Sequence, residues 1–298
     1  MVSSASDPVP HGFPHLETVR AALTALYRRL PYETLRGWDA SVPPAEVALA
    51  DDEELHPGVE RVAAALVDHY RLPRARILVT FREMTHAATV ELAQGPEYVV
   101  ELNSRFRSHR RDIGAALAHE VAHILLHRLD LRVGNLAEDE ILTDTVAAYL
   151  GAGWLLLDAF RQDALTSQKL GYLTPEEFGY VLAKRAALHG EDPSVWFTSP
   201  QAYEAYVRGR ALAERDERRP PLRTAGRGDR LRYAADRRLV LAGRRPGTKP
   251  RAGYLLDAGP PPRVTFRCPT CLARLRLPLS GPLRARCGVC RRVLECDT

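Results

Sequence analysis

The spacing of hydrophobic positions changes several times along the chain, and each change marks an expected element. Apolar residues recur every three or four positions in two N-terminal stretches, which predicts helices over 16–30 and 59–70. Short runs of β-branched and aromatic residues then predict strands over 76–81, 88–92 and 98–102. A Gln-Gly-Pro turn at 94–96 separates the last two strands, so we expect them to form a hairpin.

Helical spacing returns in the middle of the chain, and a less regular pattern follows it. We predict helices over 110–127, 138–158, 175–189 and 201–215. Thr174 is the expected N-cap of the third helix, with Pro175 at its first position. Further on, Arg, Gly and Pro dominate, which indicates a linker with one hairpin over 230–241. We expect the last short strands over 264–267, 275–277 and 284–286.

These elements predict an α+β protein, with a mostly helical domain that contains a small antiparallel sheet and a small C-terminal module. The composition, with 45% hydrophobic residues among 298, is typical of a globular chain with a buried core. We divide the chain into a disordered N-terminus (1–14), a main domain (15–215), a basic linker (216–262) and a cysteine module (263–298).

Charge is divided unevenly along the chain. Residues 1–205 have 19 Lys/Arg and 29 Asp/Glu, a formal charge of −10, whereas residues 206–298 have 23 and 8, a formal charge of +15. The basic part is a candidate for binding anionic partners, although an arginine-rich tail that only aids solubility fits equally well. Residues 1–14 lack a secretory pattern, and the longest apolar stretch, 146–157, is too short to span a bilayer. We therefore expect a cytoplasmic protein without a membrane partner.

The main chemical motif is His119-Glu120-Val121-Ala122-His123, inside an apolar stretch with good helix formers. Residues four apart lie on one face of a helix, so both imidazoles can reach one metal ion, with Glu120 beside the bound water. Zinc favours such ligands and leaves one position open at catalytic sites. Two core histidines satisfied by hydrogen bonds are the alternative, but polar groups in an apolar helix are costly without a function.

A catalytic zinc site needs a third protein ligand. A third histidine in the pattern H-E-x-x-H-x-x-G-x-x-H is excluded, because Leu126 and Leu129 occupy the glycine and histidine positions. The remaining candidates are acids at the start of the next helix: Glu138, Asp139, Glu140 and Asp144. We favour Glu140 as the ligand, with Glu138 in reserve.

Two neighbouring positions have simpler alternatives. Asp144, one turn after Glu140, would accept a hydrogen bond from a ligand histidine. These acids could instead only complement the helix dipole. His127, four residues after His123, is expected on the same helical face. It lies either at the edge of the site or at a helix C-terminus.

The segment 98–157 resembles the ImmA/IrrE-type metallopeptidases. The matching residues are Val99-Val-Glu-Leu-Asn103, the run from Ala118 to His127, and Glu140-Ile-Leu-Thr-Asp144. The resemblance implies His119, His123 and Glu140 as zinc ligands and Glu120 as the base. It also implies a strand beside the cleft that holds an extended substrate by edge pairing, for which we assign Tyr98, Val100 and Asn103.

The family often cleaves a transcriptional repressor, but many members carry a helix-turn-helix instead of a cysteine tail. Of the family's properties, the substrate is therefore the one that the resemblance indicates least for this chain.

The five cysteines all lie near the C-terminus. Cys268-Pro-Thr-Cys271 and Cys287-Gly-Val-Cys290 form two C-x-x-C pairs, which predicts a zinc ribbon with a closed structural site. Two redox pairs are the alternative. Cys296 is left over and is expected to be a free thiol. Arginines surround the pairs, and we expect the ribbon to bind either nucleic acid or a protein partner.

We therefore predict a cytoplasmic zinc endopeptidase with one catalytic and one structural Zn²⁺, acting on a specific intracellular protein. One alternative is a non-catalytic regulatory or nucleic-acid-binding protein. A second is a DNA-linked protease of the SprT-like kind, against which the absence of a histidine between His127 and His189 counts.

Overall fold

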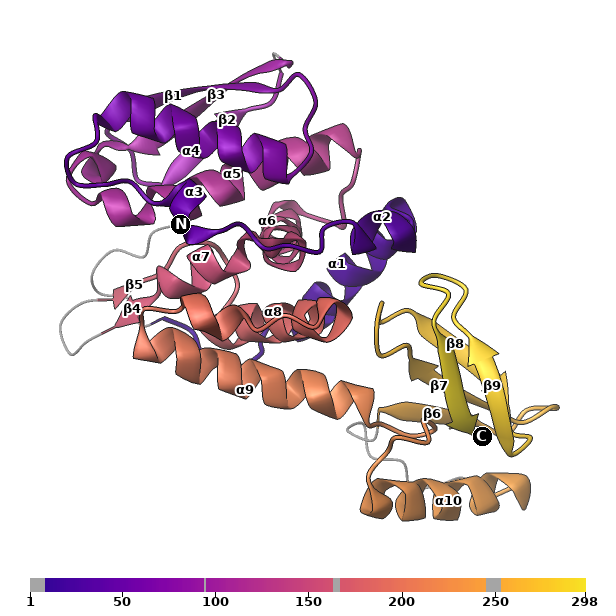
Figure 1. Cartoon of the computed structure of the whole chain (residues 1–298). Coiled ribbons are helices and arrows are strands. Elements are labelled where there is room, and N and C mark those ends of the chain that lie inside the picture. The colour runs from indigo at the N-terminus through magenta and orange to yellow at the C-terminus, as the bar shows by residue number, and fades with distance from the viewer. Residues whose placement is uncertain (1–8, 94, 163–166, 245–252) are drawn as a thin grey trace.

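The computed structural model describes residues 9–93, 95–162, 167–244 and 253–298 (Figure 1). The predicted α+β class is confirmed. The helices are α1 (Leu16–Arg29), α2 (Tyr32–Arg36), α3 (Pro44–Val47), α4 (Leu55–His69), α5 (Ile113–Arg128), α6 (Leu136–Ala147), α7 (Gly153–Asp158), α8 (Pro175–His189), α9 (Pro200–Glu217) and α10 (Arg227–Leu241). The shorter turns are η1 (Ser104–Arg107), η2 (Arg110–Asp112), the π-helical η3 (Ala148–Ala152) and η4 (Pro193–Trp196).

The strands form four small sheets. They are β1 (Arg76–Arg82), β2 (Ala88–Glu91), β3 (Glu97–Asn103), β4 (Arg161–Gln162), β5 (Ser167–Gln168), β6 (Tyr254–Asp257), β7 (Arg263–Arg267), β8 (Arg274–Pro278), β9 (Pro282–Arg286) and β10 (Val293–Asp297). In the first sheet the order is β1-β3-β2. The predicted hairpin of β2 and β3 is antiparallel, whereas β1 pairs with β3 in parallel, so this sheet is mixed. Its central strand β3 is the most buried of the three.

Helices α5 and α6 form the centre of the core. Twelve of the sixteen residues of α5 are buried, which explains why its sequence lacks a broad polar face. Among the described residues, Leu136–Asp158 is the one stretch with the length and composition of a membrane span, and 94% of its most apolar 18-residue window is buried inside the protein. It is a core segment, and the helix predicted over 138–158 is interrupted by η3. The interruption is at Gly151, whose φ of 111° disfavours any other residue.

The N-terminal residues that the structure describes are not disordered. Val9 is buried, and the backbone N–H of Gly12 donates to Glu176 at the start of α8. The hydroxyl of Thr174, the confirmed N-cap of α8, donates in turn to the Gly12 carbonyl. Residues 9–14, for which we expected disorder, therefore lie against the capped start of α8, where Thr174 and Glu176 offer them polar partners. Residues 1–8 lie outside the described part of the chain.

The region predicted as a linker with a hairpin contains helix α10 and strand β6 instead. Tyr233 and Val240, two helical turns apart, are the buried residues of α10, and Tyr233 packs edge-to-face on Tyr254 of β6. The few apolar positions over 230–241 therefore follow the spacing of a helix and not the alternation of a hairpin. Strand β6 adds to β7 and β8 and so enlarges the sheet of the cysteine module.

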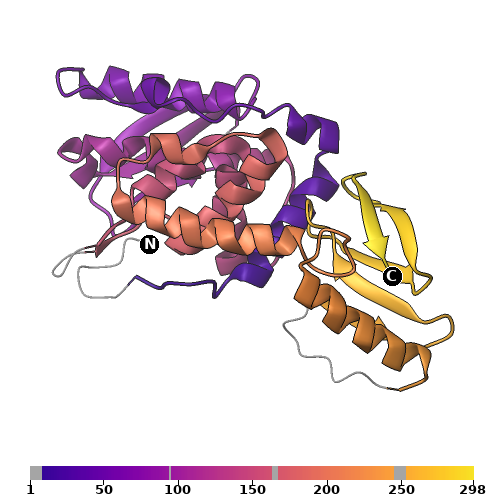
Figure 2. The ribbon, with the colours of Figure 1, turned by 60° about the horizontal axis from the view of Figure 1, so that its bottom comes forward.

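The cysteine module contacts the main domain directly. Figure 2 shows α9 running toward the module, with α10 beside it. Thr24 of α1 donates from its hydroxyl to the carbonyl of Cys271, and Arg292 pairs with Glu217 at the end of α9. After α9 the chain also bonds to β10, through Arg223 N–H and the Glu295 carbonyl. The module is therefore held against α1 and α9.

Candidate metal sites

Helix α5 presents the two motif histidines on one face. His119 and His123 are one turn apart, and their ring centroids are 4.7 Å from each other. Helix α6 packs against α5 and begins with a capping box, in which Asn135 and Glu138 satisfy each other's backbone N–H groups. Two residues after Glu138, Glu140 extends to the two imidazoles. Its carboxylate oxygen Oε2 lies 3.2 Å from His119 Nε2 and 3.4 Å from His123 Nε2.

These three atoms have the spacing that a tetrahedral metal requires. The two Nε2 atoms are 3.1 Å apart, so the edges of the triangle measure 3.1, 3.2 and 3.4 Å. Ligand atoms with bonds of about 2.0–2.1 Å to one zinc-sized ion are about 3.3 Å apart in tetrahedral geometry. His119, His123 and Glu140 can therefore hold one metal ion together.

The outer hydrogen bonds fix which ring nitrogens face the site. His119 Nδ1 donates to Asp144 Oδ1 at 2.8 Å. The hydroxyl of Thr143 donates to the Asp139 carbonyl at 2.9 Å, so its oxygen is free to accept from His123 Nδ1 at 3.2 Å. With both Nδ1 atoms carrying protons, both Nε2 atoms present lone pairs toward the Glu140 carboxylate. Three acceptors then converge, an arrangement that a cation stabilises.

Asp144 is itself held in place by a loop. It is fully buried, and its Oδ2 accepts from the backbone N–H groups of Tyr172 and Leu173. Gly171 is required beside it, because its φ is 81° and a Cβ there would lie 2.6 Å from the Asp144 carboxylate. The ring of Tyr172 stacks against that of His119 at 6.4 Å. Asp144 was predicted from the sequence, whereas Thr143 and this loop were not, and Gly171 is the sequence feature that marks the loop.

Electrostatics also favour positive charge at this place. Burial alone would lower the pKa of His119, but the hydrogen bond and charge of Asp144, together with Glu140, raise it to about 10. Burial would raise the pKa of Glu140, yet the two histidines bring it well below its usual range. Burial raises the pKa of Glu120, which is 5% exposed. Three carboxylates around two imidazoles make this part of the protein attractive to a divalent ion.

The site opens into a cleft of about 410 Å³, here called the metal cleft. One wall is the segment around β2, and the other is formed by Leu156 and the loop that includes Tyr172. Glu120 lines the cleft together with the three candidate ligands. The arrangement therefore combines a metal-binding group, a neighbouring carboxylate and room for a ligand.

The structure does not support the substrate-binding residues that we predicted on β3. Tyr98 and Val100 are buried, and β3 has partners on both sides, so it offers no free edge. The Asn103 side chain is used locally, accepting from Arg105 N–H and donating to the His86 carbonyl. The strand beside the cleft is β2 and not β3. The sequence could not show this, because it does not specify the order of the strands in the sheet.

The reserve ligand Glu138 and the neighbouring His127 lie outside the metal-binding group. Glu138 belongs to the capping box of α6, where its carboxylate accepts from the Asn135 N–H. His127 is exposed at the last turn of α5. Glu138 therefore serves the first turn of α6, and His127 has the helix-terminus position that was its alternative.

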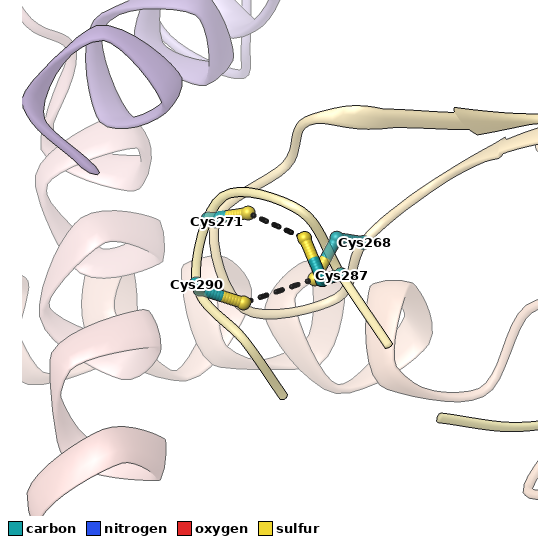
Figure 3. Close-up of side chains that lie close together, drawn as sticks. All are labelled: Cys268, Cys271, Cys287 and Cys290. Atoms are coloured by element: carbon teal, nitrogen blue, oxygen red, sulfur yellow. Dashed lines mark hydrogen bonds between the residues drawn. The ribbon is translucent and has the colours of Figure 1, made fainter. Parts of the chain in front are cut away.

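The second candidate metal site consists of four cysteines from two loops (Figure 3). The Sγ atoms of Cys268 and Cys290 are 3.5 Å apart, as are those of Cys271 and Cys287. A disulfide requires about 2.05 Å, whereas sulfurs bound to one zinc-sized ion at about 2.3 Å are about 3.8 Å apart. The sulfurs therefore match a shared ion and not two disulfides.

The two C-x-x-C loops have the same backbone geometry. In each, the residue after the second cysteine has a positive φ, 62° at Leu272 and 60° at Arg291. The N–H of that residue bonds to the carbonyl of the first cysteine. All four cysteines are at most 1% exposed. Cys296 is buried on β10 and is not part of this group.

Comparisons with known proteins give no match: no family model, no curated protein and no solved structure is similar to this chain. The resemblance to the ImmA/IrrE-type enzymes therefore stays a prediction from the motif residues.

Proposed function

We propose that this protein is a zinc-dependent peptidase. The observation that carries the proposal is the convergence of His119 Nε2, His123 Nε2 and a Glu140 oxygen within 3.1–3.4 Å of one another, at the floor of a cleft that Glu120 also lines. Two imidazoles and one carboxylate are a common zinc ligand set in hydrolases, with the fourth position left to solvent or substrate.

Zinc, when bound, supplies Lewis acidity toward water and toward a substrate carbonyl group. The protein's own residues do the rest. Asp144 and Thr143 keep both histidines in the tautomer whose Nε2 lone pair faces the ion. Glu120, next to His119 in the chain, is suited to take a proton at its carboxylate and return it to the leaving amine.

Strand β2 is the proposed docking edge for an extended peptide. Among the described residues it pairs only with β3. The Asn103 N–H bonds to the Ala87 carbonyl. In an antiparallel pair, hydrogen-bonded and non-hydrogen-bonded residues alternate along the strand. The N–H and C=O groups of Ala88, the next residue, therefore point away from β3. Ala88 also lines the metal cleft, so a substrate strand paired there would pass over the metal ligands.

The four-cysteine group is proposed to hold a second, structural zinc. A SprT-like site is not favoured, because Glu140 and not a third histidine completes the ligand group and His127 is exposed. A specific intracellular substrate and a cytoplasmic location stay predictions from the sequence.

The proposal can be tested without a known substrate. The full chain and its Glu120→Gln variant are incubated separately with a cell proteome, and newly formed N-termini are labelled and identified by mass spectrometry. The unaltered protein is expected to create N-termini that are absent with Glu120→Gln, although both bind the same amount of zinc. Glu97→Gln, a change at an exposed acid that does not line the metal cleft, is the matched control and is expected to behave as the unaltered protein. Identical N-termini from all three proteins would refute the proposal.

A further inference from the structure

A second cleft lies where the cysteine module meets the main domain, and it shares no lining residue with the metal cleft. Its volume is about 350 Å³, and we call it the arginine cleft. One wall is the open face of the sheet β6-β7-β8, and the other comes from the first turn of α1 and the end of α9. Its arginines are Arg20, Arg219, Arg267 and Arg274.

Two of these arginines face each other across a strand pair. Arg267 on β7 and Arg274 on β8 are direct antiparallel partners, so their side chains leave the sheet on the same face. Like charges in that position destabilise a sheet. Arg267 is paired with Glu17, but Arg274 is exposed and has no ion pair or hydrogen bond to any described residue. The repulsion between them is therefore only partly relieved by the protein itself.

A third arginine approaches from the main domain. Arg20 is 6% exposed and forms two hydrogen bonds to Asp216, yet its Nε has no partner among the described residues. Burial and the nearby charges of Arg20 and Arg274 lower the pKa of Arg267. The lining contains four arginines but only two carboxylates, Glu17 and Asp216, which leaves an excess of two positive charges.

We infer that the arginine cleft binds a phosphate-bearing ligand of about mononucleotide size. A phosphate group carries close to two negative charges and several acceptor oxygens, which matches the excess charge and the guanidinium donors. The hydroxyl of Thr265, two residues before Arg267 on β7, adds a neutral donor to the lining. A volume of this size accommodates a small ligand. The inference is independent of the proposed peptidase activity.

The same phosphate chemistry could come from a free nucleotide or from a nucleotide within a single strand. Calorimetric titration of the full chain with adenosine monophosphate and with a 12-residue oligothymidylate separates the two sources. Binding of the first alone identifies a nucleotide site, and binding of the oligothymidylate identifies a strand site. In either result Arg274→Gln is expected to weaken binding about tenfold, as expected for one lost charge-assisted hydrogen bond.

Arg274→Gln is the most informative variant, because Arg274 is exposed and forms no ion pair or hydrogen bond to the part of the chain that the structure describes. Arg284→Gln, an exposed arginine on β9 outside the arginine cleft, is the matched control and is expected to bind as the unaltered protein. The inference is overturned if neither probe binds at millimolar concentration. It is equally overturned if Arg274→Gln and Arg284→Gln bind a probe as tightly as the unaltered protein.

Discussion

The two candidate metal sites differ in ligand number and in exposure, the two properties that distinguish catalytic from structural zinc sites. The four cysteines offer four sulfur atoms within 4.8 Å of one another and are at most 1% exposed. The group of His119, His123 and Glu140 has three ligands, with side chains 12–22% exposed, and faces a cleft. Closed sulfur sites are typical of structural zinc, whereas three ligands with an open position are typical of catalytic zinc.

The sites also differ in what holds the ligands. The histidines and Glu140 project from α5 and α6, core helices whose packing does not depend on a metal ion. The cysteines lie on two loops, each joining two strands of a separate small sheet, and a module of this size rarely has enough hydrophobic core to fold without a metal. The comparison therefore predicts that metal loss unfolds the cysteine module but leaves the main domain folded.

The largest expected effect is that of Cys268→Ser. A structural zinc site contributes about 10–16 kcal/mol of apparent binding free energy, and this energy is coupled to folding. We expect the variant to lose one metal ion per chain and to show increased amide hydrogen exchange over 263–298. Mass spectrometry of exchange and metal analysis measure both effects. Cys296→Ser is the control and should keep both ions; equal effects of the two changes would contradict the assignment.

The next effect concerns the outer hydrogen bonds of the open site. Asp144→Asn removes the charge that accepts from His119 and from two loop amides, so the affinity for metal at this site should fall about 10- to 100-fold. Thr143→Val removes a single contact to His123 and should have a smaller effect. Competition with a zinc chelator measures both. Asp144→Asn should leave the cysteine site unchanged, and an equal loss at both sites would argue against separate roles.

A third prediction tests whether a peptide substrate pairs with the edge of β2 beside His119, His123 and Glu140. Ala88→Pro removes the N–H that points away from β3, and proline is tolerated at the first position of a strand. We expect KM for a peptide substrate to rise about tenfold with little change in kcat, since one substrate hydrogen bond is lost. Ala88→Val adds bulk but keeps the N–H, and it should retain the original KM. If both variants behave alike, the effect is steric and the edge pairing is wrong.

The smallest effect comes from a histidine that binds no metal. His69 bonds through Nε2 to the Leu150 carbonyl, and burial lowers its pKa to about 4. The unfolded chain therefore takes up a proton as the pH falls below about 6.5, before the folded protein does, and stability is lost between pH 6.5 and 4. At pH 5.5 the loss is about 1 kcal/mol.

Denaturant unfolding at pH 7.5 and 5.5 measures this difference. His69→Gln should reduce it, whereas His86→Gln, at an exposed histidine, should not. A pH dependence unchanged in His69→Gln would refute the assignment.

Much of this architecture was predictable from the sequence, because it depends on local signals. The period of α5, the cap at Thr174 and the spacing of the C-x-x-C pairs each specify their own structure. The placement of β3 between β1 and β2 was not predictable, because strand order depends on contacts between distant segments. For the same reason Glu140 was identified beside the motif, but Tyr172, 28 residues beyond Asp144, was not.

The most direct test of the central claim is zinc-edge X-ray absorption of the full chain, combined with metal counting, for the unaltered protein and His119→Ala. The account predicts two zinc ions per chain with a mixed average environment of sulfur and of nitrogen or oxygen. His119→Ala should keep one zinc, surrounded by four sulfurs. An unaltered protein that binds a single zinc with sulfur ligands alone, or a variant that keeps both ions, would contradict the claim that His119, His123 and Glu140 hold a metal ion.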